Sequence, residues 1–382
     1  MTIEPTQGDS NGPVLKSPWE FKQYGQSGVA ISDLFPHLAK QADRLAVIRS
    51  MVNESAVHAN ASYWMNTGWG LMGHPRVGSW VNYGLGSEAD NLPGYVVLNG
   101  GLMPVGGIDN FRNGFLPASY GLTLFERSDP AVPNLTPGDA ARQPAQLGLI
   151  NTLDGEFSAS LGNPDAVESA IRNHELAAKL QSSAPGLLDL DGGSAATKDL
   201  YGINHPFEHT RTYARQCLLA RRLVERGVRF VALTMPRVQG DIRWDAHGAL
   251  SKNHSEHALT VDQPIAALLA DLAGHGLLED TVVACVTEFG RTPFSQGGDG
   301  RDHSQFGFSV WLAGGGVKGG TVYGATDEYG YKVVDGKMQI HDLHATLLHL
   351  LGVDHTKQTY RFSGRDFRLT DVHGRVVREL LA

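Results

Sequence analysis

Apolar positions along this chain form two kinds of pattern, short runs rich in β-branched residues and longer stretches with helical spacing. The short runs predict strands at residues 45–48, 95–98, 228–233, 282–286 and 308–312. The longer stretches predict helices at residues 34–42, 164–183, 210–226, 255–275 and 342–351. Because helices alternate with apolar strands, we expect an α/β fold, a three-layer sandwich with a mainly parallel central sheet.

The arrangement of these elements indicates one domain. Residues 1–18 are polar and contain glycine and proline, so we expect an irregular N-terminal arm there. No flexible Gly/Ser-rich or Pro-rich linker divides residues 19–382, which we therefore expect to form a single α/β domain. Residues 68–144 are dense in Gly, Pro, Asn and Ser and predict a long functional loop. A hairpin is predicted within residues 367–377, with its turn at His373–Gly374.

Composition narrows the classes of function. The chain has 382 residues, 41% of them hydrophobic, which is enough for a sizeable core. Its formal net charge of -8 and its lack of long basic runs argue against a nucleic-acid partner. The two cysteines, Cys217 and Cys285, are far apart and predict neither a disulfide framework nor a thiolate zinc site. We expect no membrane span and no signal peptide in this chain, and the sequence decides neither localisation nor oligomeric state.

Side chains that bind metals well follow two of the predicted strands. Asp245 and His247 lie in a loop after the strand at 228–233. A carboxylate with neutral imidazole suits zinc, manganese or iron better than calcium, which prefers oxygen alone. A solvated polar loop is the alternative for this pair, and the spacing does not separate the two interpretations.

A second cluster follows the strand at 282–286 and contains Glu288, Arg291, Asp302 and His303. Glu288 can bind a metal, Arg291 can hold an anionic ester oxygen bidentately, and His303 can be a ligand or a general acid. The alternative is an ordinary ion pair between Glu288 and Arg291. A carboxylate at the carboxyl end of a buried strand favours a functional site, because α/β proteins place their chemistry there.

Two more groups extend the candidate site. His341 and His344 fall near the first turn of the helix at 342–351, beside backbone N–H groups that favour anions. Alternatively, His341 and His344 cap the helix or lie on the protein surface. His58 and Asn60 follow the strand at 45–48 and would reach the same sheet edge. A lone histidine before a helix is more often structural.

Two segments resemble a known superfamily. Thr287-Glu288-Phe289-Gly290 is similar to the sulfatase and phosphatase signature in which a strand ends in Thr/Ser-Asp-His/Asn-Gly. Residues 341–352 resemble the helix Asp-Ile-x-Pro-Thr-Leu-Leu-x-Leu-x-Gly of the same group. Their order is that of the alkaline phosphatase superfamily. Within it, Gly300-Arg301-Asp302-His303 and residues 312–320 resemble an uncharacterised sulfatase-like family, domain of unknown function 1501.

This resemblance implies a metal-dependent hydrolase of sulfate or phosphate esters, acting on a small-molecule or glycan ester. It implies a divalent cation, zinc, manganese or calcium, whose ligands are Asp245, His247, Glu288, His303 and His344. Arg291 would hold the anion, and His303 would serve as a ligand or general acid. His58 would be the nucleophile or an acid/base partner. Relatives with this pattern are often exported.

Two departures from the family pattern leave a rival hypothesis open. Relatives carry an Asp-rich strand ahead of the Ser-Pro-Trp found here at residues 17–19, and this chain starts just short of that strand. Phe289 stands where a second metal ligand is expected. The rival is a non-catalytic or degenerate sulfatase-like protein that binds anionic glycans. In that hypothesis Trp69, Trp80 and Tyr83 stack on sugar rings.

Overall fold

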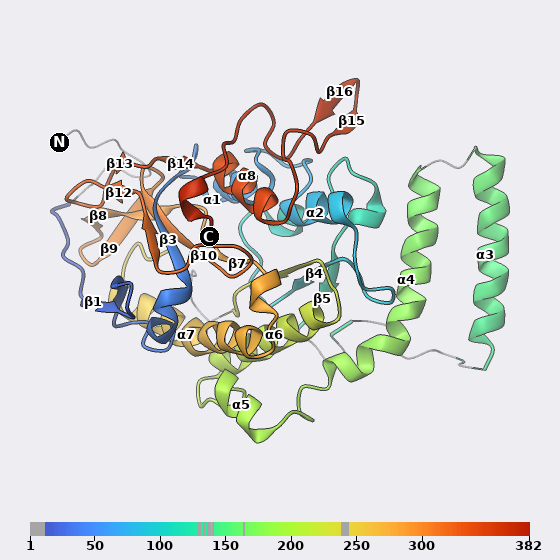
Figure 1. Cartoon of the computed structure of the whole chain (residues 1–382), viewed down its shortest axis with the longest axis horizontal. Coiled ribbons are helices and arrows are strands. Elements are labelled where there is room, and N and C mark those ends of the chain that lie inside the picture. Colours follow the sequence, from blue (N-terminus) through green and yellow to red (C-terminus); the bar gives the residue numbers. More distant parts are fainter. Residues whose placement is uncertain are drawn as a thin grey trace.

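The computed structural model describes residues 12–127, 131–132, 135, 139, 141–162, 165–237 and 244–382. Its strands lie in the middle of the molecule, and helices cover them from two sides (Figure 1). Helices α6 (Glu208–Glu225) and α7 (Leu250–Gly274) lie on one side. On the other side lie α1 (His58–Thr67), α2 (Val77–Leu85) and α8 (Ile340–Leu350). The predicted α/β class is confirmed.

The largest sheet is built around β3 (Leu45–Val52) and has mixed strand directions. Its order is β11 (Thr321–Tyr323), β3, β10 (Phe308–Ala313) and β7 (Val283–Cys285), and β14 (Met338–Gln339) also pairs with β3. β11 and β14 run parallel to β3, whereas β10 runs antiparallel to both β3 and β7. The prediction of a mainly parallel central sheet is therefore not borne out.

The physical reason lies in the connection between β7 and β10. Neighbouring parallel strands need a long crossover, usually a helix. The chain between these two strands instead forms a hairpin of β8 (Gly290–Gln296) and β9 (Gly300–Ser304), so β10 returns antiparallel to β7. The sequence predicts no helix between residues 286 and 308, so the chain lacks the crossover helix that parallel neighbours usually need there.

A second sheet is parallel throughout, in the order β5 (Thr123–Phe125), β4 (Tyr95–Leu98) and β6 (Phe230–Leu233). All four residues of β4 are buried, as expected for an apolar run covered on both faces. One core cluster contains residues of β4, β10, α6 and α7, among them Val96, Ala313, Leu218 and Leu269. Both sheets therefore share a hydrophobic core beneath α6 and α7.

Most predicted helices are found close to their expected bounds, but several elements differ. The helix predicted at 34–42 is only a 3₁₀ helix, Leu38–Arg44. The helix predicted from Pro164, which lies outside the described residues, is α4 (Asp165–Leu188). Helices α2, α3 (Gln143–Ser160) and α5 (Ala195–Tyr201) were not predicted, and α2 lies within residues 68–144, which were predicted as a long loop. Strands β12 (Ala325–Thr326) and β13 (Val333–Asp335) pair antiparallel.

The predicted C-terminal hairpin is in the wrong place. The structure pairs β15 (Tyr360–Phe362) with β16 (Arg365–Phe367) instead. Its two-residue turn, Ser363 and Gly364, has φ angles of 48° and 84°. Two consecutive positive φ angles fit the primed turns that match strand twist. A serine at the first of these positions hides the usual Asn-Gly or Asp-Gly signal from the sequence.

The described part of the N-terminal arm is attached to the β8–β9 hairpin. Val14 forms an antiparallel bridge with Phe294, and the amide of Leu15 donates to the carbonyl of Pro293 at 2.9 Å. Trp19 stacks on His254 at 5.5 Å, ahead of the hairpin of β1 (Phe21–Tyr24) and β2 (Val29–Ser32). Residues 1–11 of the predicted arm lie outside the described residues. Among the described helices, none is both long and apolar enough to cross a membrane.

Candidate metal centre

Six side chains singled out in the sequence meet in one cluster. They come from the first residue of α1, from the turn before α7, from the residue three positions after β7, and from paired positions of β8 and β9. In chain order the six are His58, Asp245, His247, Glu288, Arg291 and His303. Segments nearly 250 residues apart in sequence therefore build one site, as the sequence analysis expects.

Asp245 lies at the centre of this cluster. Its Oδ1 is 2.9 Å from Nε2 of His247 and 3.0 Å from Nε2 of His303. Nη2 of Arg291 also contacts Oδ1. Nε2 of His58 lies 3.2 Å from the other oxygen, Oδ2. The Nε2 atoms of His247 and His303 are 3.1 Å apart. Three imidazole nitrogens thus converge on one carboxylate.

The second ring nitrogen of each histidine donates a hydrogen bond away from Asp245. Each acceptor is an oxygen: Glu288 Oε1 for His58 at 2.7 Å, the Ala56 carbonyl for His303 at 2.7 Å, and Gln296 Oε1 for His247. Since these oxygens only accept, a neutral imidazole here carries its proton on Nδ1 and presents a lone pair at Nε2. Partners of this kind orient histidine ligands in metal sites.

Lone pairs that face a carboxylate repel it unless a cation lies between them or the imidazoles take up a second proton. Nε2 of His58 is the clearest case: it is buried and near Asp245, yet its geometry makes no hydrogen bond. Ligand atoms of His58, Asp245 and His303 lie within 4.8 Å of one another. Donors that share an ion at about 2.1 Å are themselves roughly 3 Å apart. The cluster therefore fits a metal ion.

The donor set also bears on which metal fits. Three imidazole nitrogens and one carboxylate oxygen suit zinc, manganese or iron. Calcium takes six to eight oxygen ligands, which the described residues of this cluster do not supply. Of the cations expected from the sequence, zinc and manganese match the donors, and calcium does not.

The charges in the cluster hold its two carboxyl groups ionised. Burial favours the neutral acid, but the nearby imidazoles of His303 and His58 and the charge of Arg291 outweigh it and hold the pKa of Asp245 far below its usual value. In the same way His58 outweighs burial and lowers the pKa of Glu288. Burial opposes a charge on His58 itself, whereas the neighbouring carboxylates of Asp245 and Glu288 raise its pKa to about 9.

Local backbone contacts fix the segments that carry these groups. Arg291 and His303 are cross-strand partners in the β8–β9 hairpin, so they share one face of it. The turn that carries His247 lies directly on the start of β9: the amide of Arg301 donates to Ala246 at 2.9 Å. A Cβ on Gly300 would lie 2.0 Å from the His247 carbonyl carbon. Only glycine allows this close approach.

His344 is the predicted metal ligand that the structure does not bring into the cluster. It lies in α8, is fully buried, and its Nε2 donates to the carbonyl of Met65 at 2.9 Å. The neighbouring His341 donates to the carbonyl of Gly68 at 2.9 Å. Both histidines join α8 to α1 and to the turn that follows α1. Their position near the first turn of a helix was interpreted as that of a ligand, but their nitrogens donate to the carbonyls that join α8 to α1.

Glu288 and His58 make contacts that the sequence did not predict. Oε1 of Glu288 bonds Nδ1 of His58, and it is Nε2 of His58 that faces Asp245. Glu288 therefore supports a ligand candidate rather than being one. Arg291 contacts Asp245 and donates to the Arg301 carbonyl at 3.3 Å, so two of its N–H groups already have partners. Gln296 was missed by the sequence analysis, since an isolated glutamine in a polar strand gives no signal.

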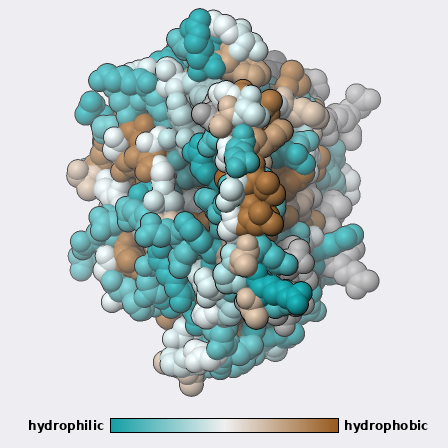
Figure 2. All heavy atoms as spheres, turned by 90° about the vertical axis from the view of Figure 1, so that its right-hand side faces the viewer, coloured by the Kyte–Doolittle hydropathy of each residue, from teal (hydrophilic) through white to brown (hydrophobic). Residues whose placement is uncertain are grey.

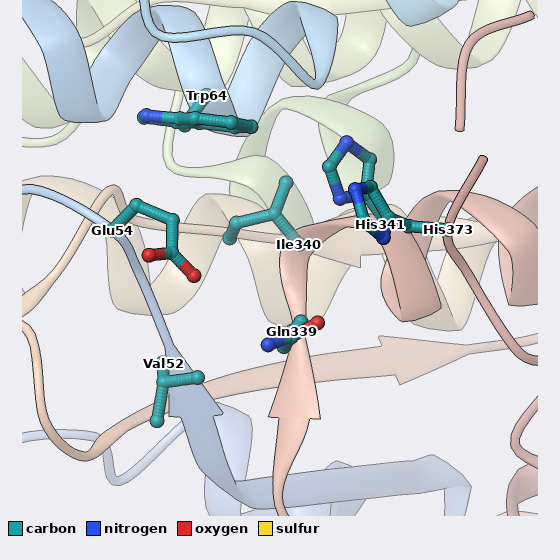
Figure 3. Close-up of a pocket in the computed structure, with 7 residues that line it drawn as sticks. All are labelled: Val52, Glu54, Trp64, Gln339, Ile340, His341 and His373. Carbon is teal, nitrogen blue, oxygen red and sulfur yellow. The ribbon is translucent and has the colours of Figure 1, made fainter. Parts of the chain in front are cut away.

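A pocket of about 230 Å³ lies between the end of β3, α1 and the start of α8 (Figure 3). Glu54, Trp64, His341 and His373 are among the residues that line it. The rings of His341 and His373 are stacked at 5.1 Å. No residue of the metal cluster lines this pocket, although α1 contributes to both sites.

The aromatic residues proposed to stack on sugars are engaged elsewhere. Trp80 is fully buried, and its ring packs edge-on against Tyr83 at 6.0 Å. Trp69 stacks on His74 at 4.2 Å. Tyr83 donates a hydrogen bond to the carbonyl of Thr359 at 3.0 Å. These rings hold α2 and the C-terminal hairpin together, so the described contacts do not favour the glycan-binding alternative.

Comparison with known proteins places the chain in a family without assigning an activity. A search of curated proteins returns no match. The model of one family covers almost the whole chain, from residue 2 to residue 381, and its description is "Protein of unknown function (DUF1501)". The chain therefore belongs to the DUF1501 family.

Proposed function

We propose that this protein is a metal-dependent hydrolase of sulfate or phosphate esters that uses a single divalent cation. The observation that carries the proposal is the convergence of three imidazole Nε2 atoms on the Asp245 carboxylate. A bound transition-metal ion polarises an ester oxygen and brings a bound water near a neutral pKa. These are the two requirements for hydrolysis of such esters at neutral pH.

This proposal gives His58 and Glu288 roles that differ from those implied by the family resemblance. Asp245, His58, His247 and His303 hold the cation, and Glu288 orients His58. His58 is then a ligand rather than the nucleophile. The guanidinium of Arg291, beside Asp245, adds positive charge to the site, which favours an anionic ester. We propose one metal ion because the described residues contain one such cluster of candidate ligands.

Membership of the alkaline phosphatase superfamily is part of the proposal. It rests on the resemblance of residues 287–290 and 341–352 to superfamily segments, together with helices on both sides of the strands (Figure 1). The position of Glu288 after β7 and of the cluster at the ends of β3 and β7 is consistent with it. The antiparallel β10 differs from the mainly parallel sheet that the sequence predicts.

The test measures metal content first and turnover second. Protein loaded with Zn²⁺ or Mn²⁺ should retain about one ion per chain after desalting, and it should hydrolyse an aryl sulfate or an aryl phosphate. His58→Ala separates the two roles of His58: a ligand variant loses metal, whereas a nucleophile variant keeps metal and loses only turnover. Exposed His349→Ala is the control. Absence of bound metal, together with absence of turnover in the wild type, would refute the proposal.

A further inference from the structure

Helix α3 lies at the edge of the molecule, as the outer helix of the α3–α4 pair (Figure 1). Of its 18 residues only Ser158 is buried. Its side-chain hydrogen bonds to α4 are made by Gln143 with Gln181 and by Ser158 with Glu168. One narrow face of α3 is thus attached to the rest of the protein, and the other faces meet solvent.

An apolar stripe runs along one of those exposed faces. Leu149, Leu153, Phe157 and Leu161 follow one another at intervals of four, which places them on one side of the helix. Each is between 54% and 61% exposed, and the adjoining Ile150 is 36% exposed. Figure 2 looks onto this side of the molecule and shows apolar side chains gathered on it. We refer to these five residues as the α3 stripe.

The α3 stripe is large and carries no charge of its own. Five such side chains expose roughly 500 Å² of apolar surface, and contiguous patches of that size commonly mark interaction sites. The charged residues within α3 are Asp154 and Glu156, and neither Lys nor Arg occurs between residues 143 and 161. A surface of this kind does not suit anionic lipid or nucleic acid, both of which need basic side chains.

We propose that the α3 stripe pairs with the same stripe of a second copy of this chain, in an antiparallel two-fold dimer. A two-fold axis midway along the stripe sets Leu149 against Leu161 of the partner and Leu153 against Phe157 of the partner. The pattern is self-complementary because its four main positions are evenly spaced and similar in size. Opposed helix dipoles also favour the antiparallel arrangement.

The apolar area that the two stripes bury determines how stable this dimer can be. Two stripes together bury about 1,000 Å², the lower limit of a specific protein–protein interface. A weak, reversible dimer is therefore expected, in equilibrium with monomer, rather than an obligate one. This inference is independent of the metal centre, because no stripe residue belongs to that cluster.

The test is sedimentation of the full-length protein over a concentration series. The wild type should show a monomer–dimer equilibrium. Leu153→Glu with Phe157→Glu should weaken dimerisation by at least about tenfold, since it buries like charges in the interface. The matched control, Thr152→Glu with Ala159→Glu, adds the same charge to the opposite, exposed face of α3 and should leave the equilibrium unchanged. Circular dichroism checks that each variant is folded.

Two results would overturn the inference. One is a wild type that stays monomeric at the highest concentration measured, including the case in which it instead binds neutral phosphatidylcholine vesicles. The other is a dimer that the stripe variant leaves intact. A cysteine pair gives an independent positive result: Leu153→Cys with Phe157→Cys should form an intermolecular disulfide under mild oxidation if the antiparallel register is correct.

Discussion

Asp245 and Glu288 are both ionised carboxylates near His58, but the two sit on opposite sides of its ring. Glu288 meets Nδ1 and Asp245 meets Nε2, so the histidine is held between them. A ring with its proton fixed on Nδ1 is a better metal ligand at Nε2. The chemistry of the site therefore depends on which carboxylate lies nearest the converging nitrogens, and that residue is Asp245.

Variants of Glu288 test this assignment. Glu288→Ala removes the acceptor for Nδ1 of His58, and loss of such a partner typically costs about 10- to 100-fold in metal affinity. Glu288→Gln keeps a side-chain oxygen that can accept the same proton, so the loss should be smaller. Affinity is measured by competition with a chelator, and exposed Glu279→Gln is the control. If Gln and Ala both abolish metal binding, Glu288 is itself a ligand.

His344 predicts a pH dependence of stability that is unrelated to the metal. Burial lowers its pKa from 6.5 to about 4 in the folded protein. The unfolded chain then binds more protons than the folded one between these values. Stability from this group is therefore complete above about pH 6.5 and is lost as pH falls toward 4. The loss by pH 4.5 is about 2 to 3 kcal/mol.

The measurement compares denaturant unfolding at pH 7 and pH 4.5. His344→Gln keeps a donor for the Met65 carbonyl but has no proton to gain, so its stability should fall less than that of the wild type. His349→Gln changes an exposed histidine on the same helix and should behave like the wild type. Equal losses in all three proteins would show that His344 is not the responsible group.

The β8–β9 hairpin is the element that assembles the site. It carries Arg291, His303 and Gln296, and the turn that holds Asp245 and His247 rests on its second strand. Residues 12–15 pair with its first strand. This hairpin also takes the place of a crossover helix, so the same segment changes the strand direction of the sheet and supplies two of the six side chains of the cluster.

Gly300→Ala tests how closely the hairpin and the turn must approach. The added Cβ would lie 2.0 Å from the His247 carbonyl carbon, so the turn has to move. We expect a loss of about 1 to 3 kcal/mol in the free energy of unfolding, together with weaker metal binding. Gly248→Ala is the matched control in the same region, because its Cβ meets only Asp299 Oδ1 at an ordinary 3.7 Å. Equal stability of both variants would contradict the role of Gly300.

The elements differ in how well the sequence predicted them. Long periodic segments such as α6 and α7, and the apolar run of β4, were predicted because burial alone determines their pattern. The apolar repeat of α3 packs against no core, and the region was left without an element. The turn at Ser363–Gly364 lacks the Asn-Gly or Asp-Gly pair that most strongly signals a hairpin. The prediction of strand direction in the largest sheet was wrong, because direction depends on how the chain connects the strands and not on the periodicity of apolar residues.

The sequence predicted which residues form the candidate site but not the contacts that each of them makes. Residue types and strand ends identified His58, Asp245, His247, Glu288, Arg291 and His303, and the structure brings all six together. Their roles could not be predicted, because those depend on which ring nitrogen faces which carboxylate. His344 shows the converse: a histidine predicted as a ligand near the first turn of a helix donates instead to the carbonyl of Met65 in α1.

At the scale of the whole molecule, the cluster joins three segments that are distant in the chain. His58 opens α1 after β3, Asp245 and His247 precede α7, and His303 lies in the hairpin between β7 and β10. Helices α1 and α7 cover opposite sides of the strands (Figure 1). A cation bound here would connect both helical layers to the largest sheet. Unfolding of any of the three segments would then release it.

Metal binding is therefore expected to stabilise the whole fold. A ligand that binds only the folded state at a hundred times its dissociation constant adds about 2.7 kcal/mol to the free energy of unfolding. Zn²⁺ or Mn²⁺ should raise the midpoint of thermal unfolding, and excess chelator should reverse the rise. In Asp245→Asn, which keeps the shape of the side chain but loses its charge, the metal-dependent rise should be largely absent. A rise of equal size in this variant would mean that the ion binds elsewhere, and the cluster around Asp245 would not be the metal site.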